Sequence, residues 1–228
     1  MLLTLPAVEV RRATPQSRVL RLACGGAFPY RAGQSALIGL HGQPDRRHYS
    51  LATPPGTART DQTLEFLVRT DRDGSIGPHL DGVQAGTLVD VEGPAGTFVF
   101  PDAFDERACL FVAGGTGIAP IRAMLLHATT LPDVRLALAY SARSSREFAY
   151  MRELGDMHGL RRLLTATREA PASWRHARGR INQTRLAGLL ESPETLCFVC
   201  GPPALVEDVP QALMKLGVEE RRIRTEIF

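Results

Sequence analysis

The chain has 228 residues, of which 44% are hydrophobic and 22% charged, and its formal net charge is +3. With 16 prolines, 21 glycines and no repeat or low-complexity run, it is not a coiled coil, a solenoid or a long disordered tail. Its apolar runs fall short of the roughly 18 residues that a bilayer span needs, and its first residues lack a signal-peptide pattern, so we expect a cytoplasmic protein with no membrane partner.

The first hundred residues read as short β-strands separated by turn clusters such as Gly25-Gly26 and Thr53-Pro54-Pro55-Gly56. Six short strands of this kind favour an antiparallel barrel or sandwich. The expected strands are 8–12, 19–22, 35–40, 49–52, 64–69 and 88–92.

The second half has a different pattern, in which apolar runs alternate with stretches of helical spacing. Strands that are apolar without alternation, each followed by a helix, predict a five-stranded parallel sheet covered on both faces, and therefore an α/β domain. The expected strands are 108–113, 136–140, 163–166, 196–200 and 223–227, and the expected helices are 118–127, 147–154, 184–190 and 204–216.

Two helix starts are marked in this half. Ser144-Ser145-Arg146-Glu147 has the spacing of a capping box, and Pro120 suits a first helical turn, where an amide has no partner. A polar, proline-bearing joint at 101–106 predicts two domains, 1–102 and 103–228.

A glycine-rich segment, Gly114-Gly115-Thr116-Gly117, lies between the first strand and the first helix of the second half. Glycines allow backbone amides to approach a diphosphate, and the start of the following helix adds positive potential. Cys200-Gly201-Pro202 repeats the order of strand end, glycine and helix start. Both segments fall at the carboxyl edge of the expected sheet, where ligands bind in such folds. A tight turn without a ligand is the alternative.

The four cysteines are too few and too scattered for a disulfide scaffold, which fits a reducing compartment. Cys197 and Cys200 are three residues apart in a strand, so their side chains are expected on opposite faces rather than as a metal or redox pair. No other Cys or His lies at zinc-ligand spacing, and we expect no metal site.

Arginines are concentrated between Arg161 and Arg185, where seven of them stand against one acid, Glu169. Such a patch suits a phosphorylated ligand or an acidic partner protein. The alternative is a solvated surface, which is the usual fate of a charge run.

Four motifs occur in an order and at separations that resemble the ferredoxin-NADP reductase superfamily over essentially the whole chain. They are Arg47-His48-Tyr49-Ser50, Glu92-Gly93-Pro94-Ala95-Gly96-Thr97-Phe98, Gly114-Gly115-Thr116-Gly117-Ile118-Ala119-Pro120 and Cys200-Gly201-Pro202. The resemblance implies a flavin-binding antiparallel barrel followed by a nicotinamide-nucleotide domain.

By this resemblance, Arg47-His48-Tyr49-Ser50 binds the flavin: Arg47 holds phosphate, Tyr49 stacks on the isoalloxazine and Ser50 hydrogen-bonds near its N5. Arginine suits the first role because its planar fork pairs with phosphate oxygens. The alternative makes Tyr49 plain core and Arg47 plain surface.

Gly74, Ser75 and Ile76 resemble the family's second phosphate cradle, whose amides meet the flavin diphosphate. Gly77 stands where the family commonly has Ser or Thr, and this departure bears on the choice of FAD over FMN. The resemblance implies FAD, with FMN as the alternative.

The final residues Thr225-Glu226-Ile227-Phe228 match the acid and terminal aromatic of plant-type members. The resemblance implies that Phe228 shields the flavin and that Ser50, Cys200 and Glu226 line the place where hydride passes from nicotinamide. A hydrophobic plug on the last strand is the alternative reading of Phe228.

For the nucleotide, the resemblance implies contacts from Gly114, Thr116, Gly117, Cys200, Gly201 and Pro202. Thr167 and Arg168 resemble the family's Ser-Arg pair that grips the adenosine 2′-phosphate, and Arg143 is a second candidate. Arginine there favours NADPH over NADH, whereas Glu169 next door opposes a phosphate.

These features predict an NAD(P)H-dependent flavoprotein reductase. The chain has no Cys-x4-Cys-x2-Cys run for an iron-sulfur centre, so the expected acceptor is a separate ferredoxin, another iron-sulfur carrier or an oxygenase component, not a nucleic acid. Two alternatives are a reductase of free flavin and a non-catalytic redox-sensing subunit.

Overall fold

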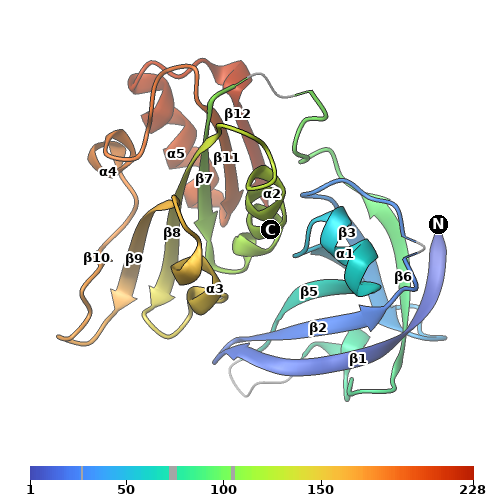
Figure 1. Ribbon diagram of the computed structural model, residues 1–228. Helices are drawn as coiled ribbons and strands as arrows, with labels where there is room; N and C mark the ends of the chain where they lie inside the picture. The colour runs from blue at the N-terminus through green and yellow to red at the C-terminus, as the bar shows by residue number, and fades with distance from the viewer. Residues whose placement is uncertain (27, 72–75, 104–105) are drawn as a thin grey trace. The chain divides into compact units, whose positions relative to one another are not determined.

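A computed structural model describes residues 1–26, 28–71, 76–103 and 106–228. The chain divides into two compact units. The first comprises Met1–Phe100 with Arg122–His127, and the second comprises Pro101–Ile121 with Ala128–Phe228. The ribbon of the chain is shown in Figure 1.

The first unit is a closed antiparallel barrel. Its six strands lie in the order β4-β3-β6-β1-β2-β5, and a bridge between Leu51 and Phe66 joins the two edges. The expected strands are confirmed, and several are longer than the sequence pattern indicates. The elements are β1 (Leu2–Thr14), β2 (Ser17–Ala23), β3 (Ser35–Leu40), β4 (Arg47–Ser50), α1 (Pro55–Asp61), β5 (Thr63–Arg69), η1 (Pro78–Leu80) and β6 (Leu88–Ala95).

The barrel interior is filled by apolar side chains that occur at every second position along the strands. Leu20 and Leu22 on β2 and Leu64, Phe66 and Val68 on β5 are fully buried and belong to one apolar cluster. Side chains two residues apart share a face of a strand, so these runs point to the same interior. The cluster also packs against Tyr49 on β4.

The second unit is a parallel sheet of six strands in the order β10-β9-β8-β7-β11-β12. The α/β class is confirmed. Five strands are those expected, and the sixth, β10, is two residues long. The elements are β7 (Ala108–Gly114), η2 (Gly115–Gly117), α2 (Ile118–Ala128), β8 (Arg135–Ser144), α3 (Met151–Asp156), β9 (Arg161–Glu169), β10 (Ala177–Arg178), α4 (Gln183–Ala187), β11 (Leu196–Gly201), α5 (Pro203–Lys215), η3 (Glu220–Arg222) and β12 (Ile223–Ile227).

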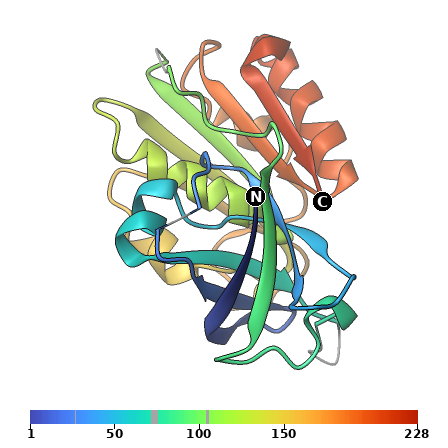
Figure 2. The ribbon, with the colours of Figure 1, turned by 90° about the vertical axis from the view of Figure 1, so that its right-hand side faces the viewer.

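Helices cover this sheet on both faces, as its uninterrupted apolar strands predict. One face packs against α4 and α5 through a cluster that includes Val112, Cys197 and Leu213. The two ribbon views show α2 on the opposite face (Figures 1 and 2). Cys200 lies outside that cluster, and its thiol contacts Glu226 instead, so the two cysteines separate as expected.

The capping box expected at Ser144 is wrong. Strand β8 continues through Ser144, and the next helix, α3, begins only at Met151, after Tyr150 has turned into the left-handed region at φ 59°. The Ser144 hydroxyl accepts from the amide of Arg146, and the Ser144 carbonyl accepts from Glu147. The motif therefore forms a turn at the end of a strand, because serine also satisfies amides two residues on in non-helical turns.

Candidate functional site

The parallel sheet reverses its direction of growth between β7 and β11. The chain adds β8, β9 and β10 on one side of β7 and then returns to add β11 and β12 on the other. Ligands of open α/β sheets bind outside the carboxyl ends of the strands at such a switch point. Gly114 ends β7 and Gly201 ends the paired strand β11, so both glycine-containing segments lie there.

Close packing requires most of these glycines. A Cβ atom on Gly114 would lie 2.8 Å from Cδ of Pro202, and one on Gly201 would lie 2.7 Å from Cδ2 of Leu205. A Cβ on Gly117 would lie 2.5 Å from the carbonyl oxygen of Cys200. Gly115 adopts φ +57°, which favours glycine. The segment is thus a tight turn that starts α2 in direct contact with Cys200.

Cys200, Glu226 and Phe228 gather beside this turn. Strands β11 and β12 place Cys200 opposite Glu226, and the thiol donates to Oε2 of Glu226 over 3.8 Å. The amide of Phe228 donates to the carbonyl of Gly201 over 3.4 Å. The Phe228 ring, half exposed, lies 2.8 Å from where a Cβ of Gly117 would stand. An aromatic ring therefore covers the turn at the switch point.

Burial raises the pKa values of Glu226 and Cys200. It raises the pKa of Glu226 to about 7, although the thiol of Cys200 donating to it acts in the opposite direction. Burial and the nearby Glu226 raise the pKa of Cys200 well above 9.0. Cys200 is therefore a neutral thiol, and Glu226 takes up or releases a proton near neutral pH.

The carboxyl ends of β8 and β9 continue the same edge of the sheet. Thr167 donates its hydroxyl to the carbonyl of Ala142 over 3.2 Å, which ties the two strand ends together. Arg143 and Arg168 follow them and are both exposed. Among the described residues neither guanidinium group has a hydrogen bond or an ion pair, so both are available to bind an anion.

Tyr140 on β8 is a residue that sequence reasoning missed. Its ring is fully buried, its hydroxyl donates to the carbonyl of Gly115 over 3.1 Å, and it accepts from the amide of Ala149 over 3.1 Å. The sequence offers one hint: Tyr140 lies in an apolar run, which predicts a buried ring. A buried tyrosine needs a hydrogen-bond partner for its hydroxyl. The Tyr140 hydroxyl therefore connects the turn at Gly115 to the backbone at Ala149.

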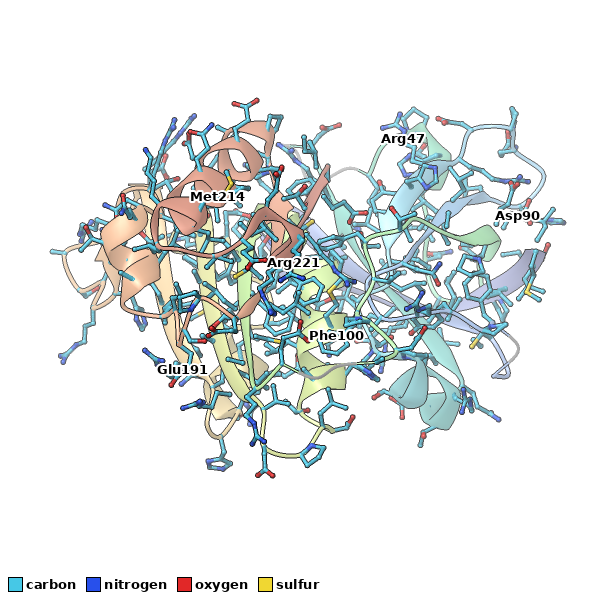
Figure 3. The ribbon with its side chains drawn as sticks, turned by 90° about the horizontal axis from the view of Figure 1, so that it is seen from above. Arg47, Asp90, Phe100, Glu191, Met214 and Arg221 are labelled. Carbon is cyan, nitrogen blue, oxygen red and sulfur yellow. The ribbon has the colours of Figure 1, made fainter. Side chains whose placement is uncertain are left out.

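In the barrel, strand β4 presents Arg47 and Tyr49 on one side. The Tyr49 hydroxyl contacts Nε2 of His79 at 2.9 Å, and the two rings lie within 14° of parallel. A Cβ on Gly77 would lie 3.1 Å from Nη1 of Arg47. Arg47, labelled in Figure 3, is half exposed and has a loose ion pair with Asp45 at 3.9 Å. Burial raises the pKa of Tyr49, against the effect of Arg47.

The structure describes some of the other barrel residues of the expected site. Ser50 is half-buried at the end of β4 and pairs with Ser35 on β3, and His48 is exposed. Ile76 is buried. Gly74 and Ser75 lie outside the described residues. His79 carried no recognisable signal in the sequence.

The arginine-rich segment largely binds its own backbone. Arg178 donates to the carbonyls of Ala170 and Pro171, and Arg185 donates to those of Arg178 and Arg180. Arg161 donates to the carbonyl of Gly188 and pairs at 3.0 Å with Glu191, which Figure 3 labels. Arg162 donates to the carbonyl of Leu154. Within the described chain, Arg168 and Arg175 have no such partner. The expected docking patch therefore offers fewer free guanidinium groups than the sequence suggests.

All four cysteines are buried free thiols. In the described parts of the chain, no three His, Cys, Asp or Glu side chains gather closely enough to hold a metal ion. None of the described helices has the length and apolar character needed to cross a membrane.

The fold and the site define a nucleotide-binding α/β unit preceded by a closed antiparallel barrel. Two protein-family models match the chain accordingly: an oxidoreductase FAD-binding domain over residues 8–100 and an oxidoreductase NAD-binding domain over residues 111–211. The matches confirm the expected flavin and nicotinamide cofactor classes.

Named relatives agree with these matches. Ferredoxin-NADP reductase B of Sorangium cellulosum is 31% identical, with 97% of this chain and 95% of the relative covered. The reductase subunit of an aromatic O-demethylase from Amycolatopsis is 29% identical, covering 99% of this chain and 69% of that protein. A solved structure, the ferredoxin reductase of carbazole 1,9a-dioxygenase, superposes with a TM-score of 0.87 at 25% identity, covering all of this chain and 69% of that one.

The chain belongs to the ferredoxin-NADP reductase superfamily and contains both of its oxidoreductase domains. It spans only part of several curated relatives, for example 56% of an NADPH oxidoreductase of Mycobacterium tuberculosis and 53% of a flavohemoprotein of Rhodopirellula baltica.

Proposed function

We propose that this chain is an NAD(P)H-dependent flavoprotein reductase that passes electrons through FAD to a separate ferredoxin-like or oxygenase partner. FAD is assigned to residues 1–102 and the nicotinamide nucleotide to residues 103–228. The observation that carries the proposal is the gathering of Cys200, Glu226 and Phe228 over the turn at the sheet's switch point. Relatives named as reductase components of oxygenase systems support the choice of partner.

The barrel residues fit a flavin nucleotide. Arg47 is a half-exposed cation with a weak protein partner, and the missing side chain of Gly77 lets its guanidinium lie close to the backbone of residue 77. Tyr49 supplies a flat ring for stacking, with Ser50 and His48 flanking it. When bound, the flavin accepts an electron pair from the dihydronicotinamide and releases electrons singly. We assign Gly74, Ser75 and Ile76 to the cradle for the flavin diphosphate, to which Ile76 contributes its backbone.

The second unit supplies the nucleotide contacts. Gly114, Thr116 and Gly117 offer amides at the start of α2. Gly201 offers its amide just before α5, and Pro202, which has no N–H, provides an apolar surface beside it. Cys200 and Glu226 line the nicotinamide, where Glu226 holds or releases a proton, and the Phe228 ring excludes water.

The adenosine end of the nucleotide is assigned to Thr167, Arg168 and Arg143. The two exposed arginines favour NADPH, whose 2′-phosphate gives their donors an acceptor. A cytoplasmic setting follows from the same proposal, in keeping with four free thiols.

The test is the visible spectrum of the purified protein before and after anaerobic addition of NADPH or NADH, with the extracted flavin identified by mass. We expect bound FAD that bleaches with the nucleotide. Tyr49→Ala and Arg47→Ala should each weaken flavin binding about 10-fold or more, whereas Arg59→Ala, an exposed arginine of α1, should not. A colourless protein that turns over only with added flavin contradicts the proposal.

A further inference from the structure

His79 is a buried histidine with an unpaired nitrogen. His79 belongs to the short helix η1, and 1% of its surface is exposed. Nε2 contacts the Tyr49 hydroxyl at 2.9 Å, but Nδ1 has no hydrogen-bond partner in the described structure. A buried polar atom without a partner is costly, and native proteins rarely leave one without a reason. The unpaired Nδ1 therefore points to a ligand atom.

The space next to Nδ1 is shared with Arg47. Because Gly77 has no side chain, its Cα faces both groups: a Cβ atom there would lie 3.3 Å from Nδ1 of His79 and 3.1 Å from Nη1 of Arg47. The two nitrogens thus lie close to each other, beside the Cα of Gly77. Arg47 approaches its nearest carboxylate, on Asp45, only to 3.9 Å.

The chemistry of the two nitrogens selects the ligand. Arginine has only donors, so it cannot accept a proton from Nδ1. Burial and the positive charge of Arg47 lower the pKa of His79, with Asp45 opposing them, which favours a neutral ring with a single N–H. If the Tyr49 hydroxyl donates to Nε2, that proton is on Nδ1. An oxyanion then satisfies both Nδ1–H and Arg47, as neither group can satisfy the other.

We propose that His79 is a cofactor-binding residue that donates Nδ1–H to a phosphate oxygen of the flavin nucleotide, alongside Arg47, while its Nε2 positions Tyr49. The inference rests on the proposed flavin site of the barrel. His79 would thus contribute to binding both the flavin phosphate, directly, and the isoalloxazine ring, through Tyr49.

Two substitutions separate the nitrogens. Glutamine places an amide nitrogen near the Nε2 position, and asparagine places one near the Nδ1 position. The full chain, stripped of flavin, is titrated with FAD, FMN and riboflavin, which lacks phosphate. We expect His79→Gln to weaken FMN and FAD binding about 10-fold with riboflavin affinity changed less than about twofold, and His79→Asn to keep the preference for FMN over riboflavin within about threefold.

The outcomes are distinct. If the wild type binds flavin and His79→Gln keeps its preference for FMN over riboflavin, the His79 inference fails while the proposed function stands. If the wild type binds none of the three, both fail. Nitrogen NMR of the wild type guards against a misfolded variant: we expect a protonated Nδ1 whose resonance shifts with FMN and not with riboflavin, and an unprotonated or unresponsive Nδ1 overturns the inference.

Discussion

Tyr140→Phe tests whether the turn that we assign to phosphate binding, residues 114–117, is held by a buried hydroxyl. The substitution keeps the ring and removes two hydrogen bonds, leaving the amide of Ala149 and the carbonyl of Gly115 unpaired. Ala149 is fully buried, whereas Gly115 is only half-buried, so its carbonyl has access to water. One full desolvation cost plus one ordinary hydrogen bond amounts to about 2–3 kcal/mol of unfolding free energy.

The chain carries its own reporter for this measurement. Trp174, the sole tryptophan, stacks on Phe148 at 5.4 Å, and Phe148 packs edge-on against Tyr140 at 4.9 Å. Urea unfolding followed by tryptophan fluorescence therefore reads the second unit. We expect the KM for the nicotinamide nucleotide to rise about fivefold, which corresponds to about 1 kcal/mol of lost loop order.

Tyr30→Phe is the matched control, since the Tyr30 hydroxyl donates to the carbonyl of Thr53 in the barrel, over 2.7 Å. It should destabilise the first unit and leave the KM for the nucleotide unchanged. An unfolding free energy for Tyr140→Phe within about 0.5 kcal/mol of the wild type, which is the range of ordinary surface changes, refutes the reasoning.

Two further predictions concern the nucleotide edge. Because burial raises the pKa of Glu226 from 4.5 to about 7, the folded protein should lose stability as pH rises from 4.5 to 7. Glu226→Gln should remove about 1–2 kcal/mol of this loss, a value reduced for partial exposure; parallel stability curves for both proteins contradict it. Arg168→Ala should raise the KM for NADPH about 10-fold and that for NADH less than about twofold. Arg178→Ala, whose guanidinium binds backbone carbonyls, is the control, and equal effects of Arg168→Ala on both nucleotides place the 2′-phosphate elsewhere.

The strands of the second unit were predictable because burial on both faces makes each of them a continuous apolar run. Strand β10 was not, since Ala177 and Arg178 have no apolar pattern and pair with β9 through the backbone alone. Helix α3 was misplaced for a related reason. Ser144 to Glu147 can cap a helix or close a turn after a strand, and only the length of β8 decides between them.

Candidate site residues can be proposed from the sequence where their chemistry is local. The glycine-rich segment and the motif beginning at Arg47 each place several functional groups within four residues. His79 contacts Tyr49 and Tyr140 contacts Gly115, partners that are 30 and 25 residues away in the chain. A buried hydroxyl or imidazole gains its role from a partner that the fold supplies, and no local pattern indicates that partner.

The arginine-rich segment shows that a charge run can be structural and electrostatic at once. A guanidinium that binds a carbonyl keeps its full charge, so Arg178 and Arg185 still contribute to the field around the molecule although their donors are occupied. Ion pairs with Glu191 and Asp208 offset only part of that field. Long-range attraction of an anionic ligand or an acidic carrier therefore survives, and it should weaken with salt. Within the 161–185 segment, the guanidinium groups left for specific contacts are those of Arg168 and Arg175, which have no partner in the described chain.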